Sequence, residues 1–78
     1  MIQQINTMQD VVTFMKQITG EITDFHPLED FSRYIDPMTN LPRYTKEEAA
    51  IRNGLIDSCI NVCIAQDADF FTLSLDFF

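Results

Sequence analysis

The sequence has little of several residue types, and each shortage excludes a class of protein. Its 78 residues include only two glycines, Gly20 and Gly54, so no glycine-rich loop can cradle a phosphate. No segment approaches the roughly 20 consecutive apolar residues that a transmembrane helix needs. The N-terminal residues show neither the basic region nor the apolar run of a signal peptide. We therefore expect a soluble, cytoplasmic protein with no membrane-bound part.

Basic residues are also scarce, with five Lys and Arg against twelve Asp and Glu, which gives a net charge of −7. The charge is segregated along the chain: −4 over residues 1–32, +1 over residues 33–52 and −4 over residues 53–78. Such a surface repels phosphate backbones, so we expect no direct binding to nucleic acid. The acidity favours solubility. The alternative is that the protein mimics a nucleic acid and blocks a basic protein.

Residues that could carry chemistry are few. Cys59 and Cys63 are four residues apart, a poor disulfide framework, so we expect a reducing compartment. On a helix the two thiols would face the same way, as ligands of a soft metal do. They stand among apolar residues, however, where free cysteine packs as a small hydrophobe. We expect both to be reduced and buried. His26, the only histidine, precedes Pro27, where capping a helix is a simpler role than acid–base catalysis.

One stretch, residues 45–66, predicts a long central helix. Thr45 and Glu48 form a capping box in which each side chain satisfies the other residue's free backbone N–H. At about 100° per residue the apolar side chains cover more than half of the circumference, so we expect other elements to cover this helix on most sides. These side chains are Ile51, Leu55, Ile56, Cys59, Ile60, Val62, Cys63 and Ile64.

Two further features of this helix are unusual. Arg52 lies on the apolar side of the helix, and we expect its guanidinium to pair with Glu48 or to reach solvent. Ala50, Gly54 and Ser58 form a strip on the less apolar side. Glycine inside a helix lowers its stability by up to about 1 kcal/mol relative to alanine. Close approach of another backbone, within the monomer or across a dimer, would explain why Gly54 occupies this position. The alternative is a tolerated surface glycine.

Two helices are predicted before the central one. The first spans about residues 8–19, with Thr7 as N-cap, Asp10 in the first turn and Gly20 as a left-handed stop. The second spans about residues 27–35, beginning at Pro27 and ending at Asp36, since a residue before proline avoids helical geometry. A turn-rich loop then leads to Thr45.

The tail, residues 67–78, fits a short helix capped by Asp67 or Asp69. A strand that pairs with residues 2–6 is the alternative, which would make the fold α+β. With 46% hydrophobic residues the chain can form one compact core. We expect one domain over residues 1–78: a compact all-α fold of three helices plus a short C-terminal element. Phe71, Leu75 and one terminal Phe should complete its core, and the remaining aromatic side chains should stay available to a partner.

A resemblance adds to this interpretation. Phe14, His26-Pro27, Asp30-Phe31, Tyr34 and the segment 45–49 make residues 25–63 resemble small bacterial cytoplasmic proteins with no known activity. The resemblance implies no catalytic residue.

We therefore expect a non-enzymatic, acidic protein that binds a protein partner or itself and uses no cofactor. The second hypothesis is a nucleic-acid mimic that blocks a basic protein, and the third is a metal or redox protein that uses Cys59 and Cys63. The candidate interaction surface is Phe70, Phe71, Phe77, Phe78, Ala50, Gly54 and Ser58.

Overall fold

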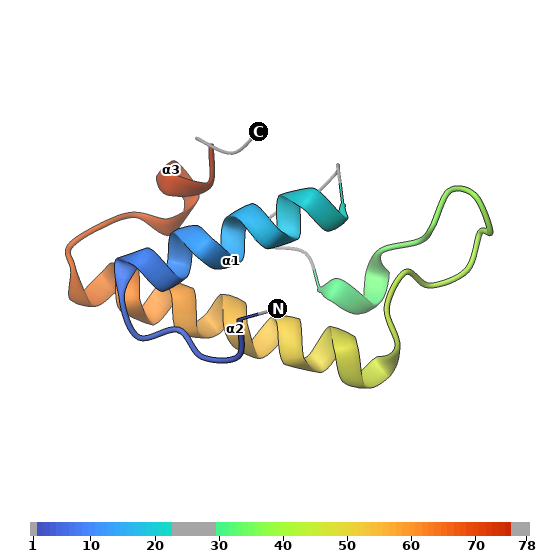
Figure 1. The fold of residues 1–78 in the computed structure, drawn as a ribbon, viewed down its shortest axis with the longest axis horizontal. Coiled ribbons are helices and arrows are strands. Elements are labelled where there is room, and N and C mark those ends of the chain that lie inside the picture. Colours follow the sequence, from blue (N-terminus) through green and yellow to red (C-terminus); the bar gives the residue numbers. More distant parts are fainter. Residues whose placement is uncertain (1, 23–29, 76–78) are drawn as a thin grey trace.

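The computed structural model describes residues 2–22 and 30–75 (Figure 1). In chain order it contains α1 (Met8–Glu21), the 3-10 turn η1 (Phe31–Arg33), α2 (Lys46–Ala65) and α3 (Phe70–Ser74). The central helix α2 contacts each of the other three elements. Within the described ranges the only β-type pairing is one isolated bridge. The all-α prediction is confirmed, and the alternative in which the tail forms a strand is wrong.

Helix α1 begins where its sequence predicts. The Asp10 backbone N–H donates to the Thr7 hydroxyl (3.2 Å), and the Thr7 N–H donates to the Asp10 carboxylate (3.1 Å). Val11, Phe14, Met15 and Ile18 are buried along one face. The helix does not stop at Gly20, so that prediction is wrong. It runs to Glu21 and leaves through an extended Ile22, a path that needs no left-handed residue.

Helix α2 begins with the predicted capping box. The Glu48 N–H donates to the Thr45 hydroxyl (3.1 Å), and the Thr45 N–H donates to the Glu48 carboxylate (2.9 Å). Only one face of α2 is buried. Its buried residues are Ala49, Arg52, Leu55, Ile56, Cys59 and Cys63. The expectation of cover on most sides is wrong, because Ile51 and Ile64 are exposed. The other elements contact α2 on that one face.

A tight reversal joins α2 to α3. Asp67 adopts a left-handed conformation (φ 56°), its N–H donates to the Ile64 carbonyl (3.1 Å), and the Ala68 N–H donates to the Cys63 carbonyl (2.8 Å). This is a Schellman motif, which satisfies carbonyls at the helix end. Asp69 is then the N-cap of α3, since its carboxylate accepts the Phe71 N–H (3.0 Å).

The predicted helix over residues 27–35 is wrong where the structure describes it, and residues 27–29 lie outside that part. Residues 31–33 form a single 3-10 turn, and the chain is extended at Tyr34. The cap is Asp30, whose carboxylate accepts from the Ser32 N–H (2.9 Å) and from the Asn53 amide (2.8 Å). Ile35 pairs with Pro42 in an antiparallel bridge, so the chain from residue 34 onward forms a hairpin. A helix that ran through Ile35 could not make this pairing.

The tail packs with a different face from the one predicted. Phe70 and Ser74 are buried, whereas Phe71 and Leu75 are exposed; Phe77 and Phe78 lie outside the described residues. The cap at Asp69 sets this rotation, because it makes Phe70 the first helical residue. Ser74, four residues later, then shares the buried face. Its hydroxyl donates to the Phe71 carbonyl (2.7 Å), which satisfies the buried oxygen.

Candidate functional site

The most distinctive feature of the surface is a hairpin formed by residues 34–43, which projects from one end of the molecule (Figure 1). Its two arms are joined by the Arg43 N–H donating to the Tyr34 carbonyl and the Asp36 N–H donating to the Leu41 carbonyl, both at 2.8 Å. Asp36 also braces the turn: its carbonyl accepts the Asn40 N–H (2.7 Å), and its carboxylate accepts the Met38 N–H (2.8 Å).

The hairpin exposes large apolar side chains. Met38 is 91% exposed, Leu41 62% and Ile35 51%. Turn formers surround them, and Asn40 takes the left-handed conformation that the turn requires (φ 58°). The turn is therefore held by its own backbone hydrogen bonds while its apolar side chains remain in solvent.

An aromatic cluster fixes the hairpin to the core. Phe31 is fully buried, and its ring centroid lies 5.5 Å from that of Tyr34 and 5.7 Å from that of Tyr44. The Phe31 N–H donates to the Asn53 side chain on α2 (3.0 Å). Because Tyr34 and Tyr44 flank the two arms, both ends of the hairpin rest on one buried ring.

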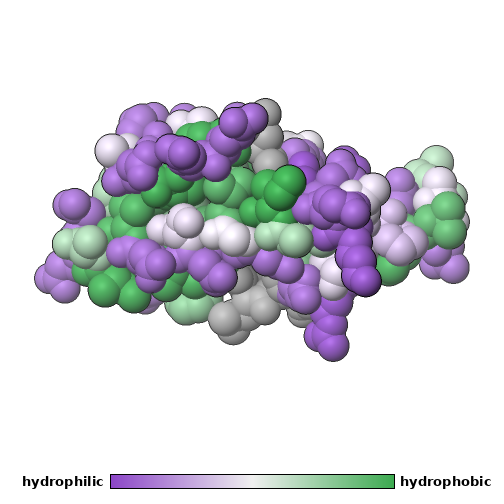
Figure 2. All heavy atoms as spheres, turned by 90° about the horizontal axis from the view of Figure 1, so that it is seen from below, coloured by the Kyte–Doolittle hydropathy of each residue, from purple (hydrophilic) through white to green (hydrophobic). Residues whose placement is uncertain are grey.

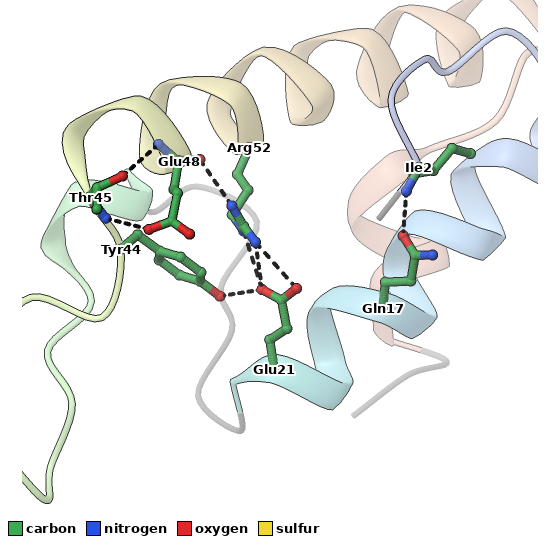
Figure 3. Close-up of polar contacts among 7 residues, drawn as sticks. All are labelled: Ile2, Gln17, Glu21, Tyr44, Thr45, Glu48 and Arg52. Atoms are coloured by element: carbon green, nitrogen blue, oxygen red, sulfur yellow. Dashed lines mark hydrogen bonds and ion pairs between the residues drawn. The ribbon is translucent and has the colours of Figure 1, made fainter.

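A polar network beneath the hairpin links α1 to α2 (Figure 3). The Glu21 carboxylate accepts from the Tyr44 hydroxyl (2.7 Å) and from Arg52 Nε (3.2 Å), with Arg52 Nη2 also 3.1 Å away. The Arg52 guanidinium lies 4.3 Å from the centroid of the Tyr44 ring. Arg52 thus pairs with Glu21, not with the Glu48 carboxylate as expected. Glu48 contributes its backbone carbonyl (3.2 Å).

Burial raises the pKa of Tyr44, Cys59 and Cys63. Burial, followed by the hydrogen bond to Glu21, raises the pKa of Tyr44 to about 12. Burial, with a smaller effect of Cys63, raises the pKa of Cys59 to about 12. All three groups are therefore neutral at physiological pH. Cys59 and Cys63 are free and buried, as predicted. A buried thiol with a raised pKa is a poor nucleophile and a poor metal ligand.

The charges around the hairpin are of both signs. Arg33, Arg43 and Lys46 are exposed within or beside it, and Asp36 is the one acidic residue between them in the sequence. Arg43 lies over the Tyr44 ring, 5.1 Å from its centroid. Arg52 adds no net charge here, because Glu21 neutralises it. The exposed Asp30, Glu47 and Glu48 stand beside these bases, so the apolar hairpin lies at an end of mixed charge.

A hollow of about 270 Å³ lies at the base of the hairpin. It is lined by Glu21, Ile22, Tyr34, Ile35, Asp36, Pro37 and Arg43. Its volume falls just below the range of about 300–1,000 Å³ usual for small-molecule sites. Its Glu21 carboxylate is already bonded to Tyr44 and Arg52. The hollow favours no particular ligand.

The residues predicted as an interaction surface are spread over two helices. On α2, Ala50 and Gly54 are exposed, and the half-buried Ser58 donates its hydroxyl to the Gly54 carbonyl (3.1 Å). A Cβ added at Gly54 would meet no atom of residues 2–22 and 30–75 within 4 Å, so the prediction of close backbone packing within the monomer is wrong for this part of the chain. Contact across a dimer stays a prediction. On α3, Phe70 belongs to the core and Phe71 is exposed.

Sequence reasoning did not identify the hairpin as a site, although a signal was present. Met38 and Leu41 are large apolar residues in a segment otherwise made of Asp36, Pro37, Thr39, Asn40 and Pro42. Turn formers predict a surface loop, and apolar residues in such a loop have no core to enter. The network residue Glu21 gave no comparable signal, because its partners are 23 and 31 positions away.

Fold and site together define a small helical domain with an exposed apolar hairpin at one end. No protein-family model, curated protein or solved structure matches this chain. Across residues 2–22 and 30–75, no helix combines the length and the apolar character needed to cross a membrane. In the same part of the chain, no group of three or more His, Cys, Asp or Glu side chains could hold a metal ion.

Proposed function

We propose that this protein is a non-enzymatic protein-interaction module and that the hairpin is its binding element. The observation that supports this proposal is the exposure of Ile35, Met38 and Leu41 on a braced turn. Apolar side chains grouped on a surface mark interaction sites. Because Asp36 and Asn40 already fix the turn, docking would cost less conformational entropy than ordering a flexible loop.

The neighbouring polar groups support a structural role over a catalytic one. Glu21, Tyr44 and Arg52 satisfy one another, and this network holds the hairpin's second arm against α1 and α2. A catalytic group needs free hydrogen-bonding capacity aimed at a substrate. The network instead gives the hairpin a rigid base, which a binding element requires.

Mimicry of a nucleic acid is supported less well. A mimic should present acidic groups along a continuous surface, whereas Arg33, Arg43 and Lys46 gather at the hairpin end. The most exposed apolar side chain, Met38, lies at that same end. A partner that uses the hairpin therefore meets apolar groups first.

Site-specific photo-crosslinking tests the proposal. A photoreactive amino acid replaces Met38 in the full chain, in the cells that express it, and a second protein carries the same amino acid at the exposed Lys16 of α1. We expect a discrete cross-linked product from position 38 and none from position 16. Leu41→Ser should reduce the product several-fold, whereas the matched change Thr39→Ser in the same turn should not. Equal products from both positions, or no effect of Leu41→Ser, would contradict the proposal.

A further inference from the structure

Met38 differs from the other methionines that the structure describes. It lies in the turn of the hairpin and is 91% exposed, whereas Met15 is fully buried in the core and Met8 is half-buried. Figure 2 shows the hairpin projecting at the right-hand end of the molecule, with hydrophobic residues on its surface. The thioether of methionine is a common target of oxidants. Access from solvent therefore selects Met38 among these three side chains.

The two cysteines are the other sulfur groups that an oxidant could reach, and both are protected. Cys59 is 0% exposed and Cys63 is 1% exposed. The thiolate is the reactive form of cysteine, and burial raises the pKa of both thiols. Neither thiol is therefore accessible or ionised at physiological pH. Within residues 2–22 and 30–75, Met38 is the sulfur that an oxidant meets first.

The backbone of the turn does not depend on the Met38 side chain. The Asp36 carboxylate accepts the Met38 N–H (2.8 Å), and the Asp36 carbonyl accepts the Asn40 N–H (2.7 Å). An oxygen added to the exposed Met38 sulfur would enter solvent and leave these bonds intact. An oxygen added to Met15 would instead place an unpaired polar group in the core. Oxidation at Met38 thus changes the surface of the protein without unfolding it.

From these observations we infer that Met38 is a site of reversible oxidation to methionine sulfoxide, with hydrogen peroxide as the oxidant. A sulfur lone pair attacks one peroxide oxygen, an S=O bond forms, the O–O bond breaks, and water leaves. The sulfur is oxidised by two electrons, and the peroxide is reduced by the same two. A methionine sulfoxide reductase reverses the step. Two thiols then become a disulfide, and the oxygen leaves as water.

Oxidation makes the hairpin less apolar at its most exposed position. The sulfoxide is polar, and burying it against a partner without a hydrogen bond is unfavourable. Ile35 and Leu41 remain apolar, but both are less exposed than Met38. This consequence rests on the proposed function, in which these three side chains dock on a protein partner. The hairpin therefore binds in its reduced form and is weakened by peroxide.

Peptide mass spectrometry of the full folded chain after graded treatment with hydrogen peroxide tests the assignment. We expect Met38 to gain one oxygen at least about tenfold faster than Met15, because a buried side chain reacts only after the structure opens. Met8 should fall between them, and both thiols should stay unmodified. In urea the three methionines should react at similar rates. A sulfoxide reductase with dithiothreitol should restore Met38. Equal rates for Met38 and Met15 in the folded protein, or earlier oxidation of a thiol, would overturn the assignment.

Photo-crosslinking tests the consequence for binding. A photoreactive amino acid at the exposed Thr39 leaves Met38 in place. In a desalted lysate of the cells that express the protein, which lacks the reductant for sulfoxide reductases, the oxidised chain should give several-fold less product than the reduced chain. Reductase treatment should restore the product.

Two variants serve as matched controls. Met38→Leu keeps the apolar volume but cannot be oxidised, so its product should be the same before and after peroxide. Met38→Gln places a polar amide there, so its product should be low in both cases. Equal products from the reduced and oxidised wild-type chains would overturn the consequence. No product from the reduced chain would contradict the proposed function and this consequence with it, whereas the peptide masses decide the site of oxidation independently.

Discussion

At the scale of single residues, Arg52 shows why a charged side chain can occupy the core of this protein. Its guanidinium is bonded on three sides, by Glu21, by the Glu48 carbonyl and by the face of Tyr44. The sequence predicted an anomaly at Arg52, because a helical wheel places it among apolar residues. It could not predict the partner, since Glu21 belongs to a different helix and no local spacing connects the two.

The same network makes a pH-dependent prediction about Tyr44. Burial and Glu21 raise its pKa to about 12, whereas an exposed tyrosine titrates near ~10. The folded protein therefore holds the phenolic proton more tightly than the unfolded chain. This contribution to stability is complete below pH ~10 and is lost as the pH rises toward about 12. Unfolding free energies should fall over this range, and Cys59, whose pKa is also raised, should add to the fall.

Tyrosinate absorbance measures the effect directly. The variant Tyr34→Phe leaves Tyr44 as the only tyrosine in the chain. In the folded protein the tyrosinate signal should appear well above pH ~10, and in urea it should appear near the ordinary value. Glu21→Gln removes the carboxylate that holds the proton, so it should lower the native titration point. A folded Tyr44 that titrates near ~10 would show that it is neither buried nor bonded to Glu21.

At the scale of elements, local chemistry decided which parts of the fold were predictable. Helices α1 and α2 both begin with a Thr and an acidic residue three positions later, and the structure uses both capping boxes. The segment around residues 31–35 was wrongly predicted because its conformation depends on distant groups. Asn53 on α2 holds Asp30, and Pro42 pairs with Ile35. The hairpin's apolar residues were visible in the sequence, but their exposure and rigidity depend on that pairing.

Helix α3 supports a prediction about orientation. Phe70 is buried and the adjacent Phe71 is exposed, although the two side chains are chemically identical. Phe70→Ala should lower the free energy of unfolding by about 3 kcal/mol, because it leaves a cavity. Phe71→Ala should cost less than about 1 kcal/mol, as exposed positions usually do. Urea denaturation of both variants measures the difference. Equal losses, or a greater loss at Phe71, would mean that α3 is rotated from the position described.

At the scale of the whole molecule, the excess of acidic residues determines how salt acts on stability. With a net charge of −7, the folded chain repels itself. The long axis measures 40 Å. Charges interact over a Debye length of about 30 Å at 0.01 M salt, about 8 Å at 0.15 M and about 3 Å at 1 M. Repulsion across the molecule therefore acts mainly at low salt.

This self-repulsion predicts that salt stabilises the folded protein, most steeply at low concentration. Between 0.01 M and 0.15 M salt the Debye length falls from about 30 Å to about 8 Å, so most of the gain in unfolding free energy should come in this range. Urea denaturation across a salt series measures the gain. The variant Arg43→Glu/Lys46→Glu replaces two positive charges by two negative ones, which changes the net charge from −7 to −11, so its stability should depend on salt more steeply. A wild-type chain whose unfolding free energy falls as salt is added would show that screening of ion pairs such as Glu21 with Arg52 outweighs the relief of repulsion.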